Sequence, residues 1–370
     1  MSIRFKLVAS GLMTALALAA GVAAQQPRIE NGTVTAQPAG ATFAASFRAL
    51  VAAHAGIAWV GYAVPVLDRE RTMCCFDSGV TSARGTATGC CGACRLENSS
   101  GTSLSTRNPV TTASGTVKLE GSDRMVVLFR VVEQKIERVR VFSEDCQLDA
   151  GGRPVQWLEN VRPADSIALL ESLTAGDGDL EERIKDGAIT AIALHGDVAA
   201  DAALERLVAP GQPEAVRKKV TFWLGNARGR RGFDALGRVV REDPSIEVRK
   251  SAIFGLSRSR VPETVDTLVT IARGDSEPRL RSEALFWLAQ KAGQKVSATI
   301  VERIDQDPDT DVKKKAVFAL SQLPKEEGVP LLIKVARTNS NTEVRKQAMF
   351  WLGQSKDPRA IDFFSEVLRK

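Results

Sequence analysis

Apolar residues in the second half of the chain return with a period of 32 residues. One column of leucines shows the period directly, since each member lies 32 positions after the one before: Leu224, Leu256, Leu288, Leu320, Leu352. A second column keeps the same step: Leu204, Leu236, Leu268, Ile300, Leu332, Phe364. Around Leu268, the apolar residues Val265, Val269 and Ala272 complete the i, i+3, i+4, i+7 stripe of an amphipathic helix. Each unit is therefore predicted to contain two short helices.

One such hairpin cannot bury its apolar face alone, so neighbouring units must stack. The phrases "DPSIEVRKSAIFGL" and "DPDTDVKKKAVFAL" resemble HEAT repeats of the short, phycobilisome-lyase-like type. This resemblance covers about residues 180–370 and implies a right-handed α-α solenoid, a HEAT-like superhelix of about six units. It implies little about function, because the scaffold serves many binding roles. Gly225 and Gly353 are expected to end the first helices of their units.

The seventh position of the repeated phrase is a phenylalanine in five units: Phe222, Phe254, Phe286, Phe318, Phe350. At about 100° per residue, this column points away from the apolar side of the helix and lies among lysines. An apolar stripe there favours a surface for a protein partner. The neighbouring column alternates large and small residues: Trp223, Gly255, Trp287, Ala319, Trp351. Packing of each indole beside a small residue explains the alternation, and a binding groove is the alternative. Burial of the phenylalanines against neighbouring helices is likewise an alternative to an interface.

A basic residue occupies the second position of the same phrase: Arg217, Arg249, Arg281, Lys313, Arg345. On a helical wheel this position falls inside the apolar arc. A charge there needs a carboxylate or carbonyl partner on the next turn or the next unit. These residues are therefore expected to be structural rather than to bind a ligand.

Residues 27–161 lack the repeat and are predicted to form a small antiparallel α+β domain, followed by the solenoid at 163–370. The β-branched runs "MVVLFRVVE" and "KIERVRVF" predict two strands joined by a tight turn, and "GTVKLE" and "PVQWLENV" could add two more. "ATFAASFRALVAAHAG" is one possible helix. Residues 76–118, rich in Gly, Ser and Thr, are expected to be a long loop tied by cysteines.

All six cysteines lie in this first domain: Cys74, Cys75, Cys90, Cys91, Cys94, Cys146. An even number in an exported chain favours disulfides, with Cys74 and Cys75 reaching toward the other four rather than toward each other. A zinc site on Cys75, Cys91 and Cys94, with Cys74 or Cys90, is an alternative. A redox role for the Cys91–Cys94 pair lacks the adjacent thioredoxin-like pattern.

The first 24 residues read as a secretory signal peptide: Arg4 and Lys6 precede an uncharged run that ends in small residues. An uncleaved membrane anchor is the alternative. Removal of the segment would lower the formal net charge from +6 to +4. We therefore expect a periplasmic or secreted protein of bacterial origin, without nucleic-acid partners.

No catalytic constellation is evident. The chain has two histidines, His54 and His195, and neither has a second histidine at metal-binding spacing. We therefore predict no enzyme, no cofactor and no metal. The densest basic run, "NARGRRGFDALGR", is a weak candidate for an anionic membrane surface or an acidic peptide.

The most specific reading is an exported protein-interaction scaffold whose partner contacts the phenylalanine and tryptophan columns. A metal- or thiol-active first domain carried by the repeats is the alternative, and self-association through the same stripe is a third reading.

Overall fold

The computed structural model describes residues 28–67, 73–74, 94–97, 122–175, 179–292 and 296–369. Its first part contains a five-stranded sheet in the order β2-β8-β3-β5-β6. The strands are β2 (Val34–Pro38), β3 (Ala58–Pro65), β5 (Arg124–Val132), β6 (Lys135–Ser143) and β8 (Val155–Glu159). β5 and β6 form the predicted hairpin, and Glu133 and Gln134 turn the chain between them with positive φ angles.

This sheet is mixed, so the prediction of an antiparallel domain was wrong. β8 pairs in parallel with both β2 and β3, whereas β3–β5 and β5–β6 are antiparallel. A strand's alternating pattern reports which face is buried and not the direction of its neighbour, and β8 reaches its place between β2 and β3 from far along the chain.

Three short parallel strands lie beside the main sheet in the order β1-β7-β4: β1 (Ile29–Glu30), β4 (Cys94–Arg95) and β7 (Leu148–Asp149). A disulfide joins Cys74 to Cys146, one of the connections that the cysteine pattern allowed. The expected strand "GTVKLE", Cys75, Cys90 and Cys91 lie outside the described residues. Of the expected loop 76–118 only residues 94–97 are described, and there the prediction was wrong, because Cys94–Arg95 pair with β7 as the strand β4.

The helix expected in the alanine-rich segment is α1 (Phe43–Ala53), which packs on one face of the sheet. Phe43 contacts Tyr62 edge to face at 5.6 Å, and Phe47 contacts Phe129 at 4.8 Å between ring centroids. The Tyr62 hydroxyl lies in this core, and burial raises its pKa above the ordinary value. Ser166 donates a hydrogen bond to that hydroxyl at 3.0 Å, which ties the sheet to α2 (Pro163–Ser172).

The rest of the described chain is helical, and six hairpins follow α2. They pair α3 (Asp179–Leu194) with α4 (Ala199–Val208), α5 (Glu214–Ala227) with α6 (Gly229–Glu242), α7 (Ile246–Arg258) with α8 (Thr264–Gly274), α9 (Pro278–Ala292) with α10 (Ser297–Gln306), α11 (Thr310–Ser321) with α12 (Lys325–Thr338), and α13 (Thr342–Gln354) with α14 (Pro358–Leu368). The predicted number of units is confirmed. No described helix combines the length and the hydropathy that a bilayer crossing needs.

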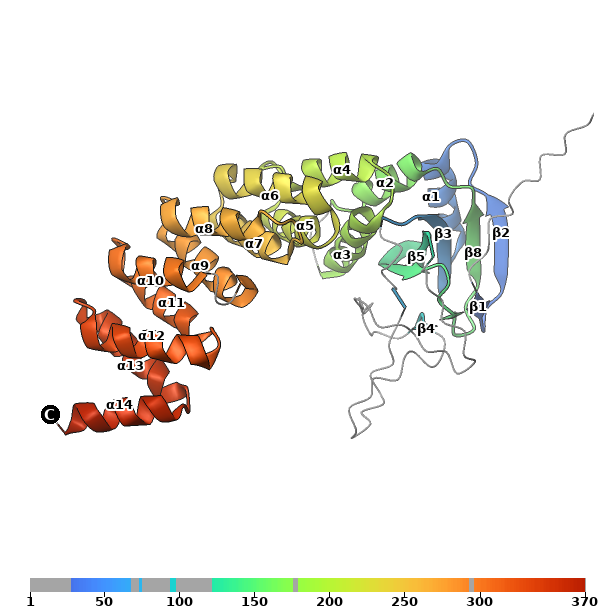
Figure 1. The fold of residues 1–370 in the computed structure, drawn as a ribbon. Coiled ribbons are helices and arrows are strands. Elements are labelled where there is room, and N and C mark those ends of the chain that lie inside the picture. Colours follow the sequence, from blue (N-terminus) through green and yellow to red (C-terminus); the bar gives the residue numbers. More distant parts are fainter. Residues whose placement is uncertain are drawn as a thin grey trace, which may run out of the picture.

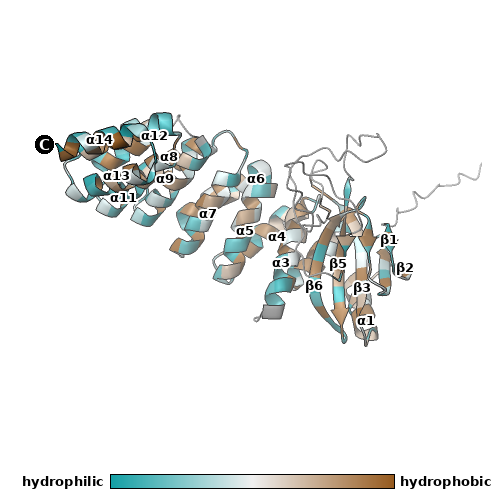
Figure 2. Cartoon of the chain, turned by 90° about the horizontal axis from the view of Figure 1, so that it is seen from below, coloured by the Kyte–Doolittle hydropathy of each residue, from teal (hydrophilic) through white to brown (hydrophobic). Residues whose placement is uncertain are grey.

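The hairpins stack into an arc that leaves the sheet at one end (Figure 1). Helices α5, α7, α9 and α11 lie on the inner side of this arc, and α6, α8 and α10 lie on the outer side. Each helix carries both hydrophobic and hydrophilic residues, as expected for units that bury one face (Figure 2). One continuous apolar core runs from Tyr62 in the sheet through every hairpin to Phe363 in α14.

The first hairpin fuses the arc to the sheet. Gly187 of α3 lies against β6 so closely that a Cβ atom there would come within 2.3 Å of Val139 O. At the C-terminal end of α3, Gly196 N donates to Pro65 O at 2.8 Å and Leu67 N donates to Leu194 O at 2.9 Å. Backbone hydrogen bonds and a tight packing contact therefore both hold the two parts together.

Each repeat is locked to the next by the predicted basic residue, whose partner is the aspartate at the start of the following unit. Arg217 pairs with Asp243, Arg249 with Asp275 at 2.9 Å, and Arg281 with Asp307 through two contacts of 2.8 Å. The residue at the partner position of Lys313 is Asn339, and Lys313 donates instead to Asp305 O; Arg345 donates to Asn339 O. The structural interpretation of this column is confirmed.

Gly225 does not end its helix, which corrects the sequence prediction. It lies inside α5, and a Cβ atom there would be 2.0 Å from Gly255 O in α7. The two helices therefore approach to direct backbone contact at this point. Gly353 occupies the same column of the repeat inside α13, but nothing lies within 4 Å of the position its Cβ would take.

Candidate protein-interaction surface

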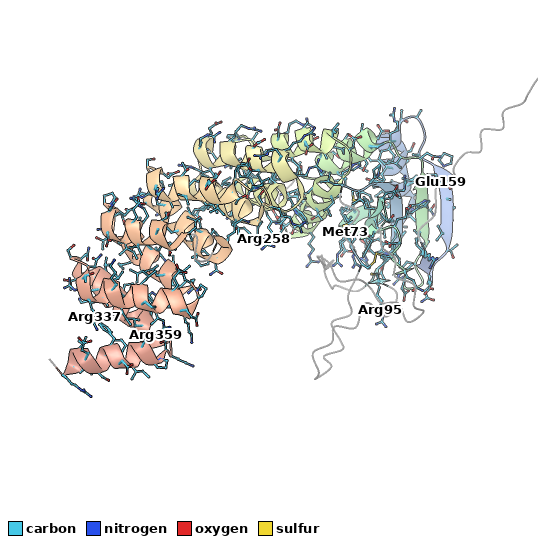
Figure 3. All side chains as sticks on the ribbon, viewed as in Figure 1. Met73, Arg95, Glu159, Arg258, Arg337 and Arg359 are labelled. Atoms are coloured by element: carbon cyan, nitrogen blue, oxygen red, sulfur yellow. A yellow bond between two sulfur atoms is a disulfide. The ribbon has the colours of Figure 1, made fainter. Side chains whose placement is uncertain are left out.

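The phenylalanine column lies on the inner side of the arc. The first, fifth and ninth residues of each phrase are buried, as in Val248, Ala252 and Leu256 of α7. Phe254 therefore points the other way, away from the outer helix α8. Arg258, one helical turn further along α7, points into the inner side of the arc (Figure 3).

The phenylalanine and tryptophan columns meet to form one unbroken series of ring contacts, here called the aromatic ladder. Its eight rings follow one another in the order Trp223, Phe222, Phe254, Trp287, Phe286, Phe318, Trp351 and Phe350. Neighbouring ring centroids lie 4.7–6.1 Å apart, which is the favourable range for aromatic pairs. The ladder therefore connects α5 to α13 along the inner layer.

The ladder has two kinds of contact between units. Phe222 stacks on Phe254 and Phe286 stacks on Phe318, with interplanar angles of 29° and 5°. At the alternate joints an indole takes the place of the stacked ring: Trp287 packs on Phe254 at 4.7 Å and Trp351 on Phe318 at 4.8 Å. The large and small residues of the tryptophan column thus correspond to alternating packing, as the sequence indicated.

Exposure differs along the ladder. Trp223 is 7% exposed, so its indole belongs to the core of the first joint. Phe350 is 55% exposed at the opposite end. The six rings between them are half-buried, and each contacts the rings before and after it in the ladder. The ladder is therefore both a packing device and an exposed apolar strip.

Charges beside the ladder are more balanced than the lysine column suggested. Lys250, Lys314 and Lys346 pair with acids one turn earlier on their own helices, at 3.3, 3.0 and 3.0 Å. One turn after the phenylalanines lies a polar row in which Arg258 contacts Asn226 at 3.5 Å and Gln290 contacts Gln322 at 3.3 Å. The sequence analysis missed this row, although its 32-residue step was visible. A hydrogen-bonding border that is uncharged except at Arg258 therefore accompanies the apolar strip.

The basic run "NARGRRGFDALGR" is not a free patch of positive charge. Asp201 binds both Arg228 and Arg231, Glu263 binds Arg230, and Glu205 binds Arg238. Arg228 is buried and also donates to His195 O at 2.9 Å. The structure therefore gives this run a role in joining α6 to neighbouring helices.

Among the residues that the structure describes, neither histidine lies beside another group that suggests catalysis. His54 Nδ1 contacts Leu50 O at 2.8 Å at the end of α1. His195 is buried where β3 meets the first hairpin, and its Nδ1 accepts from Asp197 N at 3.2 Å. Burial lowers the pKa of His195 to about 4, with Arg228 lowering and Asp197 raising it. Its Nε2 is buried without a hydrogen-bond partner among the described residues.

The disulfide changes what the cysteines can do. Cys74 and Cys146 lie with Asp145 in a cluster of metal-ligand atoms, but their sulfurs are bonded to each other. Cys74 therefore offers no thiolate to a zinc ion, so the version of the alternative zinc site that used Cys74 is wrong. Cys94 is buried in the small core beside Leu148.

The sequence profile of HEAT repeats matches residues 208–289 and 297–370. This part of the chain consists of HEAT repeats. The match begins after the α3–α4 hairpin, whose phrase had decayed in the sequence, and the structure shows that this hairpin nevertheless stacks with the HEAT repeats. No curated protein gives a significant sequence match.

Several solved structures resemble the HEAT repeats. The Escherichia coli protein YibA has 22% identity and a TM-score of 0.34, and the match covers 53% of this chain and 71% of that one. The CpcE–CpcF complex of phycocyanin lyase from Nostoc has 20% identity and a TM-score of 0.32, covering 42% and 98%. Human deoxyhypusine hydroxylase has 19% identity and a TM-score of 0.24, covering 54% and 77%. At these scores the similarities carry no argument about the function of this chain.

Proposed function

We propose that this chain is an exported protein-interaction scaffold, and that its partner lies along the inner side of the arc against the aromatic ladder. The observation that carries the proposal is the continuity of the ladder: seven ring contacts in sequence join eight aromatic rings along five helices. HEAT solenoids generally use such extended surfaces to bind proteins.

The two borders of the ladder indicate the chemistry of the partner. A strip of ring edges takes apolar side chains, and the amides of Asn226, Gln290 and Gln322 can satisfy the main chain beside them. The paired lysines leave little net charge to select an acidic partner. An extended segment with spaced apolar side chains therefore fits better than a strongly charged surface.

Export rests on the sequence of the first 24 residues and on the disulfide. A bond between Cys74 and Cys146 persists in an oxidising compartment and is rare in the cytosol. The mass and N-terminal sequence of the protein recovered from its native host test this part of the proposal. An intact leader on a cytosolic protein would contradict it.

The ladder is tested by removing its most exposed ring. Phe350→Ser removes an apolar anchor that is 55% exposed, so the variant should keep its helicity and lose at most about 1.5 kcal/mol of unfolding free energy. The matched control is Ile361→Ser, which removes an apolar side chain that is 64% exposed on α14. Triple replacement of Phe254, Phe286 and Phe318 is less informative, since these rings also stack between repeats.

The binding experiment uses the full chain on beads with a detergent extract of the native envelope. The captured partner is then purified, and its affinity is measured for each variant. We expect Phe350→Ser to weaken binding about tenfold or more and Ile361→Ser to leave it within about twofold. Equal affinities for the wild type and Phe350→Ser would refute the ladder as the contact surface.

A further inference from the structure

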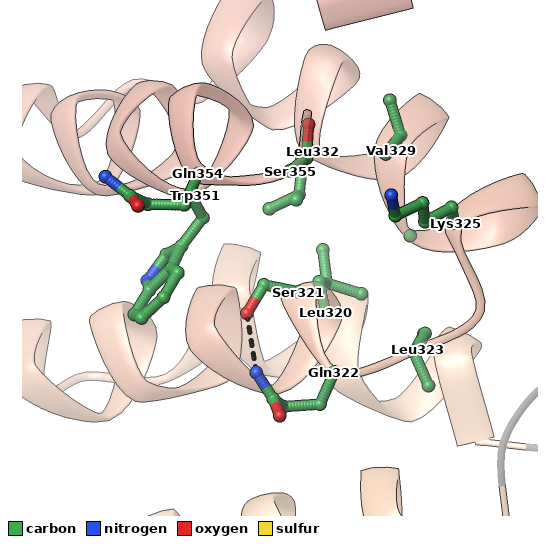
Figure 4. Close-up of a pocket in the computed structure, with 11 residues that line it drawn as sticks. Leu320, Ser321, Gln322, Leu323, Lys325, Val329, Leu332, Trp351, Gln354 and Ser355 are labelled. Carbon is green, nitrogen blue, oxygen red and sulfur yellow. Dashed lines mark hydrogen bonds between the residues drawn. The ribbon is translucent and has the colours of Figure 1, made fainter. Parts of the chain in front are cut away.

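A pocket opens at the end of the aromatic ladder, between the α11–α12 hairpin and α13 (Figure 4). Its volume is about 190 Å³, and its walls include Leu320, Val329, Leu332 and Trp351. Pockets for drug-sized ligands measure about 300–1,000 Å³. This one therefore has the size for a single long side chain rather than for a small-molecule cofactor.

The 32-residue register superimposes this pocket on the joint between α7 and α9, two units earlier. Four residues of the pocket have counterparts 64 positions back: Ser321 matches Ser257, Leu323 matches Ser259, Trp351 matches Trp287 and Gln354 matches Gln290. The two sites therefore share an indole wall and the carbonyls at the end of an inner helix.

At the earlier joint, the carbonyls hold an ammonium group. Lys291 Nζ donates to Ser257 O and to Ser259 O, each at 2.8 Å, where α7 ends. The end of a helix carries unsatisfied carbonyls and a partial negative charge, and both favour a cation. The chain thus contains its own example of an alkyl-ammonium group bound at this kind of site.

The counterpart of Lys291 at the pocket is Ser355, whose side chain is too short to repeat the contact. Its hydroxyl donates to Leu352 O at 2.7 Å instead. Over the described parts of the chain, no hydrogen bond reaches Ser321 O or Leu323 O. The pocket therefore keeps the acceptors of the earlier joint and lacks their donor.

The other joints explain why a pocket forms at this place. Between α9 and α11 the corresponding residue is Leu323, which is buried. Between α5 and α7 it is Ser259, but the backbone contact of Gly225 with Gly255 leaves no space. Between α11 and α13 residue 355 is a serine, and the counterparts of the two glycines are Ser321 and Trp351. A cavity is therefore left beside the carbonyls.

Two nearby residues set the charge of the site. Arg258 beside Lys291 adds to the burial that lowers the pKa of that lysine, and its counterpart at the pocket is the neutral Gln322. Lys325 is the one charged residue among those that line the pocket, and it is exposed at the rim. A cation that enters the pocket therefore meets no counterpart of Arg258, the residue that repels Lys291 at the earlier joint. It does meet the positive charge of Lys325 at the pocket mouth.

We propose that this pocket binds a lysine side chain of the protein partner, with the ammonium on Ser321 O and Leu323 O and the alkyl chain against Trp351. The proposal rests on the proposed function, because it assigns the pocket to the same partner. Since Trp351 belongs both to the pocket and to the ladder, a lysine bound here would place the adjoining partner segment on the ladder.

The test uses the full chain with its tryptophans labelled by ¹⁵N and N-acetyl-lysine methylamide as the probe. The Trp351 indole N–H is buried without a hydrogen-bond partner among the described residues, and its resonance is assigned by its loss in Trp351→Phe. We expect the probe to shift this resonance in a saturable way and the norleucine analogue, which lacks the ammonium, to leave it in place. A shift of equal size with both probes would overturn the proposal.

Three variants sharpen the result. Ser355→Lys should supply the missing ammonium group, raise the melting temperature of the protein and weaken binding of the probe about tenfold or more. Lys325→Gln should strengthen binding of the probe, because it removes a positive charge from the pocket mouth. Weaker binding by this variant would mean that the pocket prefers an anion and would overturn the proposal. The probe tests the pocket without the partner, whereas partner capture by Phe350→Ser tests the ladder, so failure of the ladder and failure of the pocket give different results. Unaltered probe binding by Ser355→Lys would also overturn the assignment.

Discussion

The ion pair between Arg281 and Asp307 tests whether the column of inter-repeat pairs stabilises the stack. Asp307 is 1% exposed and Arg281 is 6% exposed, and the two join α9 to the start of the next unit. Asp307→Asn removes the negative charge and preserves the shape. The amide oxygen can still accept from the N–H of residue 309, as Asn339 does from Asn341 N at 3.0 Å. The substitution therefore isolates the ion pair from the turn.

The expected loss of unfolding free energy is about 3 kcal/mol. Breaking a buried pair costs about 3–5 kcal/mol because the remaining charge stays buried. Arg281 keeps a hydrogen bond to Asp275 O at 2.8 Å, which places the loss at the lower end of that range. For a cooperative unit of 150–250 residues, this corresponds to a melting temperature lower by about 6–12 °C.

Urea unfolding followed by far-ultraviolet circular dichroism measures the effect. The control is Asp311→Asn, whose pair with Lys314 is exposed and should change stability by less than about 0.5 kcal/mol. Adding Arg281→Met to Asp307→Asn removes the orphaned charge and should recover most of the loss. If Asp307→Asn and Asp311→Asn unfold at the same urea concentration, the column of inter-repeat ion pairs does not stabilise the stack as argued.

Three further predictions concern other joints of the molecule. His195 is buried in its neutral form with a pKa of about 4, below the ordinary 6.5, so the free energy of unfolding is highest above pH 6.5 and falls by about 3 kcal/mol as the pH drops toward 4. The urea midpoint of His195→Gln should therefore change less over this pH range than that of the wild type. An equal change in both proteins would contradict the assignment. Gly225→Ala should destabilise by about 1–3 kcal/mol in thermal unfolding because its Cβ would strike Gly255 O, whereas Gly353→Ala in the same column should be neutral or stabilising; equal effects would refute the close contact. Cys146→Ser should lower the free energy of unfolding by about 4 kcal/mol, by the chain-entropy account for a disulfide between residues 72 positions apart, and reduction of the wild type should cause the same loss. A much smaller loss would mean that the bond does not restrain the unfolded chain.

Much of the solenoid could be predicted from local patterns. A period of 32 residues with helical spacing specifies hairpins, and hairpins with one apolar face must stack. The partner of the basic column could be expected in kind, because a guanidinium inside an apolar arc requires a carboxylate or carbonyl. The disulfide was one of several connections that the cysteines allowed, and the hairpin β5–β6 followed from its β-branched runs.

Other features depend on residues that meet only in three dimensions. The same glycine column contains Gly225, which contacts a neighbouring backbone, and Gly353, which faces open space, and the spacing is identical in both cases. The direction of β8 between β2 and β3 depends on pairing between segments about a hundred positions apart in the chain. The exposure of Phe350 and the burial of Trp223 depend on which neighbours stand beside them.

Periodicity by itself determined the hairpins, their number and the face that each buries, because these depend on spacing within a helix and on the need to remove apolar surface from water. The tertiary structure decided which rings touch, which charges pair and where space is left over. The contrast between Lys291 and Ser355 shows the reason: the sequence gives the residue at each register position, but only the packing of side chains from several helices shows whether the space beside it is filled.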